Sequence, residues 1–418
     1  MKKTLLLTLL LSTALAPLSR AADQYLCPGF TFEPLYKGHG MISIDFDPIG
    51  AMFVTEKAGR VLLFEPGQQR GTYKDPVPIL DLTSVIYNDN ESGVLGIAID
   101  PQFNTTHFVY VFYTTPGDQK LVRYTLNPGR TALVDPLILD QGFPRTAPNH
   151  KAGDIHFRPG EPDHIYVVLG NDVPRDNSMT ENLTVWNGKI LRVNKVDGKG
   201  LADNPFYDNN LDSIASRVWA VGFRNPFRFT FAPSGLPANA LFVSENGDGR
   251  DRFYQAEKGA NGGWNQGGDR GLMNPQDKRI HILGTHSPSM TGIAIAEKGP
   301  FASPDGKPVL YEAHWYSPEE ILRGTLEGPN WDTFKPIPSD PQGNFAVHLK
   351  TVNLKFGPDG CLYTNDAAMG PSLGNGFVLG RVKYTGGATA PAGGVVPVGG
   401  GLPAPTGATT TAPVPQLH

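Results

Sequence analysis

One pattern that recurs six times along the chain constrains its fold more than any other feature. Each copy reads as an apolar strand, a turn rich in proline, glycine or aspartate, a second apolar strand, a polar turn and a third strand that often carries arginine. The copies span residues 40–67, 93–128, 153–198, 217–249, 290–326 and 349–384. The third is interrupted by an insertion, and the fifth is the least regular.

Within each copy, apolar and polar residues alternate with period two, as a strand with one buried face requires. The 49 glycines and 38 prolines supply the chain reversals between strands. A unit of three or four antiparallel strands cannot bury its faces alone, so such units stack around an axis. We therefore predict an all-β fold, a six-bladed β-propeller of four-stranded antiparallel blades. A pair of β-sandwiches would not explain one motif that recurs six times.

The two ends of the chain lack this pattern. Residues 1–21 begin with two lysines, continue as an apolar run and end in small residues, which is the layout of a secretory signal peptide. The run is too short and too close to Pro17 for a transmembrane helix. Residues 385–418 contain no aromatic residue and consist mainly of Gly, Pro, Ala and Thr, which predicts a disordered tail. The propeller is expected over residues 23–384 of a secreted or periplasmic protein.

The chain has two cysteines, Cys27 near the start of the mature chain and Cys361 in the sixth repeat. An exported chain permits a disulfide, but two unrelated buried thiols fit the spacing equally well. In many propellers the N-terminal strand completes the last blade, which would bring these two segments together. Ring closure therefore favours a bridge modestly.

Polar residues that flank the first strand of a repeat are the candidates for function, because propellers carry their sites where the innermost strands converge. His150 directly precedes such a strand, and it is either a general base or a histidine bonded to a loop carbonyl. Arg224 and Asn225 stand at the matching point of the fourth repeat, within an apolar, aromatic segment. A guanidinium there needs an acidic partner or an anionic ligand, unless it ties two blades together.

Six segments in a fixed order resemble the soluble quinoprotein glucose and aldose-sugar dehydrogenases. They are GVLGIAIDPQF, NHKAGDIHF, NGKILRV with ADNPFYD, VGFRNPFRFTF, SENGDGRDRF with GANGGWN, and FGPDGCLYTND. The resemblance covers essentially the whole folded part and implies a six-bladed propeller that binds pyrroloquinoline quinone (PQQ). It also implies oxidation of the anomeric hydroxyl of an aldose to a lactone. His150 matches the family's base, and Arg224 with Asn225 matches the pair that polarises the quinone oxygen.

Several positions depart from the family pattern. Glu91 and Glu181 stand where the family places glutamine, and carboxylates there would repel an anionic cofactor unless they are protonated or face the sugar. Of the cations that bind the quinone carboxylates, the sixth repeat keeps Lys350. In the fifth repeat Tyr316 replaces an expected lysine, and with Trp315 it forms either an aromatic platform or ordinary blade packing.

The resemblance also implies a calcium ion, bound by backbone carbonyls and an acidic pair. The matching residues are Gly247, Asp248 and Asp251, but Arg252 stands where a carboxylate is expected. Because Ca²⁺ prefers several hard oxygen ligands, an arginine in the shell opposes the site.

Three functions remain open from the sequence. The leading one is a secreted, PQQ-dependent sugar dehydrogenase with an aldose substrate and an external electron acceptor, which would be a quinone, a cytochrome or a dye. The second is a non-catalytic propeller of the same family that binds carbohydrate or protein at the channel mouth. The third is a hydrolase with paired carboxylates on the axis. A net charge of −4 with scattered basic residues argues against nucleic acid as a partner.

Overall fold

A computed structural model describes residues 25–172, 178–237, 240–264, 277–286, 289–316, 320–338, 340, 344–366 and 377–386. The predicted signal peptide and all of the predicted tail beyond residue 386 lie outside these ranges. No helix in the described ranges is long and apolar enough to cross a bilayer.

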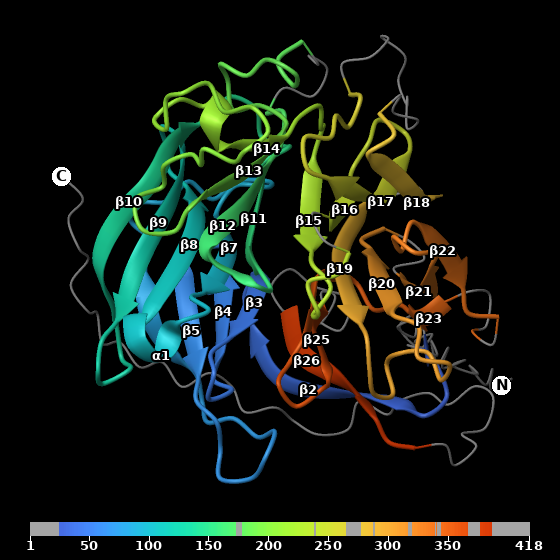
Figure 1. The fold of residues 1–418 in the computed structure, drawn as a ribbon. Coiled ribbons are helices and arrows are strands. Elements are labelled where there is room, and N and C mark those ends of the chain that lie inside the picture. Colours follow the sequence, from blue (N-terminus) through green and yellow to red (C-terminus); the bar gives the residue numbers. More distant parts are fainter. Residues whose placement is uncertain are drawn as a thin grey trace, which may run out of the picture.

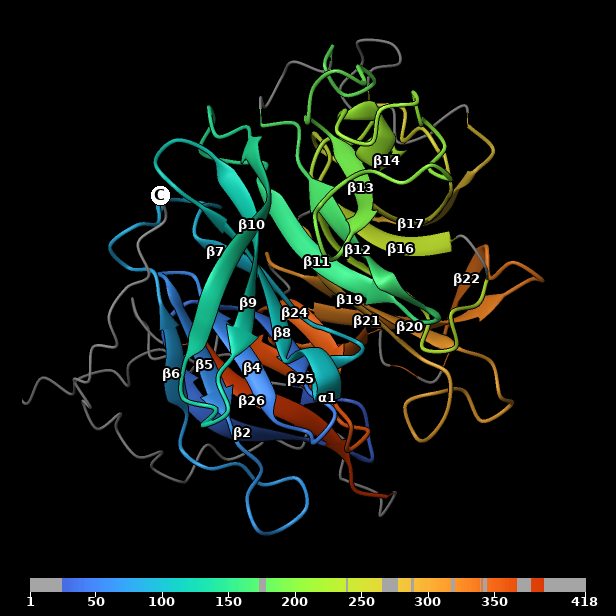
Figure 2. The same cartoon turned by 60° about the vertical axis from the view of Figure 1, so that its left-hand side comes forward.

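Six antiparallel sheets stand in a ring, as Figures 1 and 2 show from two directions. Blade 1 comprises β3 (Met41–Phe46), β4 (Met52–Glu56), β5 (Arg60–Phe64) and β6 (Val77–Asp81). Blade 2 comprises β7 (Val94–Ile99), β8 (Phe108–Thr114), β9 (Gln119–Leu126) and β10 (Leu133–Phe143), with the short helix α1 (Phe103–Thr106) in its first turn. Blade 3 comprises β11 (Ala152–Arg158), β12 (Glu161–Leu169), β13 (Lys189–Asn194) and β14 (Val218–Ala220), preceded by the 3₁₀ turn η1 (Ala215–Arg217).

The second half of the ring has the same plan. Blade 4 comprises β15 (Pro226–Thr230), β16 (Ala240–Glu245), β17 (Asp251–Glu257) and β18 (Ile280–His286). Blade 5 comprises β19 (Met290–Ala296), β20 (Val309–His314), β21 (Glu320–Glu327) and β23 (Asn344–Val347), extended by β1 (Tyr25–Leu26) and β22 (Thr333–Pro336). Blade 6 comprises β24 (Thr351–Phe356), β25 (Leu362–Asp366), β26 (Phe377–Tyr384) and β2 (Phe30–Gly38).

The predicted six-bladed propeller is confirmed, with one correction to the repeats. The strand in RVWAV pairs with β13 as the outer strand β14 of blade 3, so blade 4 begins only at β15. The N-terminal strand β2 pairs with β26, so the start of the chain completes the last blade and closes the ring.

The hydrophobic core is divided among the blade interfaces. Each of the six buried apolar clusters draws its residues mainly from two neighbouring blades, including the pair formed by blade 6 and blade 1. The six inner strands β3, β7, β11, β15, β19 and β24 each contact the next, and β24 returns to β3. No blade is therefore a complete folding unit, because its faces are covered only by its neighbours.

Arg228 on β15 holds the inner strands together at the channel axis. Its guanidinium donates to the backbone oxygens of Val352 at 3.1 Å, Leu95 at 3.1 Å and Ile42 at 3.0 Å, and to Asp154 Oδ1 at 2.9 Å. These acceptors lie on blades 6, 2, 1 and 3, so one buried side chain of blade 4 bonds to four other blades. Blade 5 is linked to blade 6, since Thr291 Oγ1 donates to the backbone oxygen of Thr351 at 2.6 Å.

The carboxylate of Asp154, which accepts from Arg228, is ionised at neutral pH. Burial opposes the charge of Asp154, but His156 and Arg228 outweigh it and lower the pKa of Asp154 to about 2. His156 Nε2 lies 3.0 Å from Asp154 Oδ2 and lines a cavity of about 440 Å³ at the far end of the channel. Asp154 and His156 therefore continue the chain of polar contacts from Arg228 toward this second cavity.

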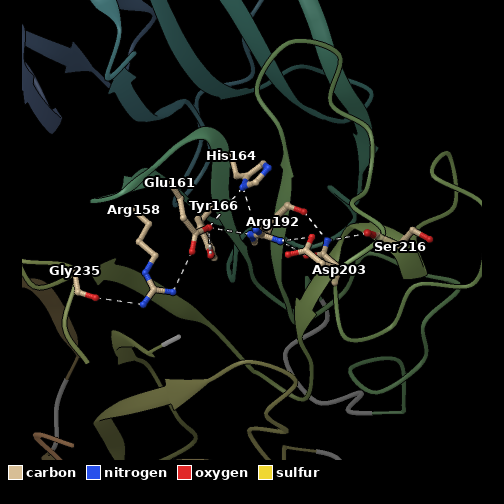
Figure 3. A network of polar contacts seen from close by, with 9 residues as sticks. Arg158, Glu161, His164, Tyr166, Arg192, Asp203, Ser216 and Gly235 are labelled. Carbon is tan, nitrogen blue, oxygen red and sulfur yellow. Dashed lines mark hydrogen bonds and ion pairs between the residues drawn. The ribbon is translucent and has the colours of Figure 1, made fainter. Parts of the chain in front are cut away.

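A second polar network fastens the long β13–β14 connection to blade 3 (Figure 3). Arg192 donates to Glu161 at 3.1 Å and to Asp203 at 2.9 Å. Arg158 donates through Nη1 to the same glutamate and through Nη2 to the backbone oxygen of Gly235 in blade 4. This network lies on the blades, away from the axis.

Neither cysteine is part of a disulfide, so the bridge favoured by ring closure is not present. Cys27 follows β1, which pairs with β23 in blade 5 rather than with blade 6, and its Sγ lies 3.1 Å from Asp340 Oδ1. Cys361 lies in the β24–β25 turn of blade 6 and packs in a different cluster. The ring is closed by the β2–β26 ladder instead.

Replacing Arg228 with methionine is expected to destabilise the fold by about 3–5 kcal/mol, because it leaves Asp154 and three backbone carbonyls buried without their donor. The measurement is urea-induced unfolding of the two proteins. Arg70→Met, which removes the same charge from an exposed loop, is the control and should change stability little. Equal unfolding midpoints for Arg228→Met and the wild type would contradict the proposed role of this side chain.

Candidate functional site

A cavity of about 550 Å³ opens at the end of the channel where the inner strands begin. Every inner strand contributes to its lining, through Ile42, Leu95, Ala152, Phe227, Thr291 and Val352. Arg228 also lines the cavity, and its bonds across the axis place it at the base. The remaining lining residues include Lys57, Glu91, Asn149, Asn246, Trp315 and Tyr316.

His150 lies two residues before β11, between Asn149 and Ala152, which both line the cavity. It is 6% exposed, and its backbone has a φ of 61°, in the left-handed region. Its Nδ1 lies 2.6 Å from Asn171 Oδ1. Because a side-chain carbonyl oxygen only accepts, Nδ1 carries the proton and Nε2 keeps its lone pair. Nε2 makes no hydrogen bond within the described ranges.

The imidazole is neutral at physiological pH. Burial lowers the pKa of His150 to about 4, and the positive charges of Arg224 and Lys151 act in the same direction, while the Asn171 bond opposes the shift. The neighbouring carboxylate of Asp172 is paired with the buried Lys151 ammonium and accepts from the backbone N–H of Thr146. A neutral amide, rather than a carboxylate, therefore orients the imidazole.

Asn171, which the sequence analysis missed, is held on three sides. Its backbone N–H donates to the backbone oxygen of Arg224 at 2.7 Å, and its backbone oxygen accepts from Asn187 Nδ2 at 2.7 Å. Its side chain meets His150. The position of the imidazole is thus coupled to the backbone of blade 4.

Glu91 joins three blades at the rim of the cavity. Its Oε2 accepts from the backbone N–H of Lys151 at 3.1 Å and from Asn225 Nδ2 at 3.2 Å. Burial raises the pKa of Glu91, although these donors oppose the shift. Two donors therefore meet one oxygen of Glu91, which ties the blade 2 rim to the segments that precede blades 3 and 4.

Arg224 and Asn225 present buried polar atoms that the protein does not satisfy. Arg224 Nη1 donates to the backbone oxygen of Asn246 at 3.0 Å, but Arg224 Nε is buried without a partner. Asn225 Oδ1 and Asn246 Oδ1 are likewise buried and unbonded. Burial lowers the pKa of Arg224, yet a guanidinium stays charged at neutral pH. The unbonded Arg224 Nε–H suits a ligand oxygen, including that of an anion, whereas the two amide oxygens suit a ligand that donates hydrogen bonds.

An aromatic wall faces this cluster. Trp315 stacks on Phe377 with ring centroids 6.3 Å apart, and both line the cavity with Tyr316, which is 53% exposed. Lys350 Nζ lies 4.5 Å from the centroid of the Trp315 ring. The predicted residues Lys350 and Tyr316 are therefore neighbours at one wall, with flat surface available to a ring-shaped ligand.

Glu181 stands apart from the other predicted residues. Its Oε1 accepts from Asn261 Nδ2 at 2.6 Å, and it is not among the residues that line the cavity. The two glutamates that depart from the family pattern thus have different environments, and only Glu91 reaches the cavity.

The predicted calcium residues are arranged around backbone donors. Asp251 Oδ1 accepts from the N–H of Gly247 at 2.9 Å, and Asp251 Oδ2 accepts from the N–H of Met290 at 3.2 Å. Arg252 forms a buried ion pair with Glu245 at 2.6 Å. Within the described ranges, no three His, Cys, Asp or Glu side chains are placed to hold a metal. Asp251 therefore already accepts two backbone donors, and Arg252 is paired with Glu245 at the position where the resemblance implies a carboxylate ligand.

Three functional candidates that the sequence analysis missed share one position. Lys57, Asn171 and Asn246 each directly follow, or lie one residue beyond, the second strand of a blade. Because that strand runs antiparallel to the inner strand, it ends where the inner strand begins, at the same mouth. The sequence carries these residues in the tripeptides 55–57, 170–172 and 244–246. They can be recognised as candidates only when the end of the second strand of each blade is known.

Residues 40–285 match the family described as Glucose / Sorbosone dehydrogenase. Among curated proteins, quinoprotein glucose dehydrogenase B of Acinetobacter calcoaceticus is 26% identical over 257 residues, which are 55% of this chain and 50% of that protein. The human Hedgehog-interacting protein is 24% identical over 241 residues, 49% of this chain and 33% of that protein. The chain thus spans half or less of these relatives.

A solved structure, the PQQ-bound aldose sugar dehydrogenase of Streptomyces coelicolor, has the same fold. It superposes with a TM-score of 0.62 at 20% identity, covering 86% of this chain and all of that chain (100%).

His150 is expected to titrate near pH 4 rather than near its ordinary value of about 6.5. Because the unfolded chain binds this proton between those values and the folded chain does not, His150 costs stability as the pH falls through that window. Proton NMR of the imidazole measures the midpoint, with His150→Gln to assign the signal. Asn171→Asp should raise the midpoint, since a carboxylate stabilises the imidazolium. A wild-type midpoint above 6 would contradict this electrostatic account.

Proposed function

Because the chain belongs to the glucose/sorbosone dehydrogenase family, we propose that it is a PQQ-dependent oxidoreductase that oxidises the anomeric hydroxyl of an aldose to a lactone. One observation carries the proposal. A buried, neutral imidazole and a partly buried guanidinium lie next to residues that line one cavity. Asn171 joins them, because its side chain meets His150 and its backbone N–H donates to the backbone oxygen of Arg224. A proton acceptor beside a stabiliser of negative charge is the pair that oxidation of an alcohol requires.

His150 is the general base. Its Nδ1–H donates to Asn171, so Nε2 accepts the proton of the sugar hydroxyl. A base with a pKa of about 4 is unprotonated at neutral pH and does not need to lose a proton before the reaction. Asn171 is a positioning residue, because it fixes the tautomer and the ring orientation without touching substrate.

The quinone, when bound, supplies an electrophilic carbon that accepts hydride from the sugar. Arg224 and Asn225 are the residues that would hold its polar edge, since Arg224 Nε and Asn225 Oδ1 are buried and unsatisfied. Tyr316 would cover its flat face, and Lys350 would provide positive charge beside the same wall. Glu181 takes no part in this arrangement.

Calcium has no role in the steps proposed. The Gly247, Asp248 and Asp251 segment remains a predicted site, but its carboxylate at Asp251 already accepts backbone donors. Export by a signal peptide at residues 1–21 and a disordered tail at residues 385–418 also remain proposals. The aldose and the external electron acceptor, a quinone, cytochrome or dye, belong to the same proposal.

The second candidate is a binding propeller without catalysis. It is favoured by the similarity to a Hedgehog-interacting protein and by the departures from the family pattern at Glu91 and Glu181. The hydrolase is less well supported, because Glu91 is the only carboxylate among the described residues that line the cavity.

Titration of the purified protein with PQQ, with and without Ca²⁺, tests the proposal. We expect saturable binding, followed by aldose-dependent reduction of a dye. His150→Ala should retain binding and lose at least about 100-fold in kcat, the usual contribution of a general base. His164→Ala, which removes a histidine from the network away from the axis, is the matched control. An absence of PQQ binding at every calcium level would instead establish the binding propeller as the better account.

A further inference from the structure

We propose that Lys57 is an anion-binding residue that holds a carboxylate of the quinone, from the side of the cavity opposite Arg224. The inference rests on the proposed function and adds to it a contact that neither the family pattern nor the sequence analysis assigned. Lys57 follows β4 in blade 1 and lines the cavity together with Asn90 and Glu91.

The ammonium of Lys57 has no ion-pair partner among the described residues, in contrast to Lys195 and Lys355. Its Nζ donates to Asn88 Oδ1 at 2.8 Å, a neutral amide. By comparison, Lys195 pairs with Asp100 at 3.0 Å and Lys355 with Asp45 at 2.9 Å. Within the described ranges, Lys57 forms no salt bridge.

Partial burial makes this lack of compensation significant. Lys57 is half-buried, and burial lowers its pKa, while the exposed Asp89 nearby only partly opposes the shift. A cation that is partly removed from water and not neutralised attracts an anion that enters the same cavity. No carboxylate among the described residues forms a salt bridge that would neutralise the charge of Lys57.

The backbone of Lys57 is fixed, so the side chain reaches the cavity from a defined point. Its N–H donates to the backbone oxygen of Gly40 at 2.8 Å, and its own oxygen accepts from the N–H of Val94 at 3.1 Å. Gly93 has a φ of 144°, and a Cβ there would lie 2.4 Å from the Lys57 oxygen. Only glycine permits this approach of blade 2 to the Lys57 turn.

The ring order places Lys57 and Arg224 across the axis from each other. Lys57 belongs to blade 1 and Arg224 precedes the inner strand of blade 4, which lies three blades away in a ring of six. Lys350, at the start of blade 6, adds positive charge beside Lys57's blade. A flat ligand with carboxylates at separate corners would meet cations on both sides. Lys57 therefore offsets the cations that the fifth and sixth repeats lack.

The inference is tested by the affinity of the apoprotein for PQQ, measured by fluorescence titration at low and high salt. This measurement does not depend on turnover. Lys57→Met should weaken binding about tenfold, the worth of one partly exposed charge pair, and should reduce the salt dependence. Lys57→Arg should retain most of the affinity. Lys74→Met, an exposed lysine of the same blade, is the matched control and should bind as the wild type does.

Asn88→Asp provides a second variant that keeps the lysine. The new carboxylate would pair with Nζ within the protein, so PQQ should again bind more weakly, even if Lys57→Met proves unstable. If the wild type binds PQQ and both variants bind it equally well, Lys57 has no such role although the proposed function stands. A changed KM for the sugar with unchanged PQQ affinity would assign the lysine to the substrate and overturn the inference. If the wild type itself binds no PQQ, the proposed function fails first.

Discussion

The buried guanidinium of Arg228 is the interaction on which the geometry of this propeller depends. A ring of six sheets leaves the starts of the inner strands facing an axial channel, where backbone groups have few partners of their own. Arg228 donates to acceptors on four other blades, and Asp154 supplies the compensating charge. Because a planar guanidinium has donors in fixed directions, it sets the distances between these strands rather than merely filling the channel.

That arrangement determines where the cavity lies and what surrounds it. Arg228 closes the channel, so the mouth above it is a pocket rather than a passage. Polar residues just before the inner strands and just after the second strands converge there, because the two strands of each hairpin are antiparallel. His150 and Arg224 arrive by the first route, and Asn171 and Asn246 arrive by the second. The site is therefore a consequence of blade register as much as of residue identity.

The electrostatics of the site divide its residues into satisfied and unsatisfied groups. Lys151 and Asp172 neutralise each other, and Arg252 is paired with Glu245, so these charges have structural roles. Arg224 and Lys57 form no salt bridge within the described ranges, and Arg224 Nε is buried without a hydrogen-bond partner. The cavity is consequently suited to an anion next to a neutral base, which is the environment that the proposed oxidation requires.

The number of blades and the expected closure of the ring by the N-terminal strand could be predicted from the sequence, because period-two alternation and turn spacing are local properties. The order of the matching segments pointed to His150, Arg224 and Asn225 as candidates, and the structure brings their segments together. Arg224 and Arg228 lie four residues apart in one short segment, and only the structure shows that their contacts differ. Arg224 donates to the backbone of Asn246 beside the cavity, whereas Arg228 ties the blades together. The disulfide prediction was wrong for a related reason. Cys27 follows a strand that pairs with blade 5, and no local pattern in the sequence reveals that pairing. Lys57, Asn171 and Asn246 became functional candidates only once the ring brought hairpin ends from different blades together. Which groups a side chain bonds to, and how deeply it is buried, depend on contacts between distant segments, so these properties follow only from the tertiary structure.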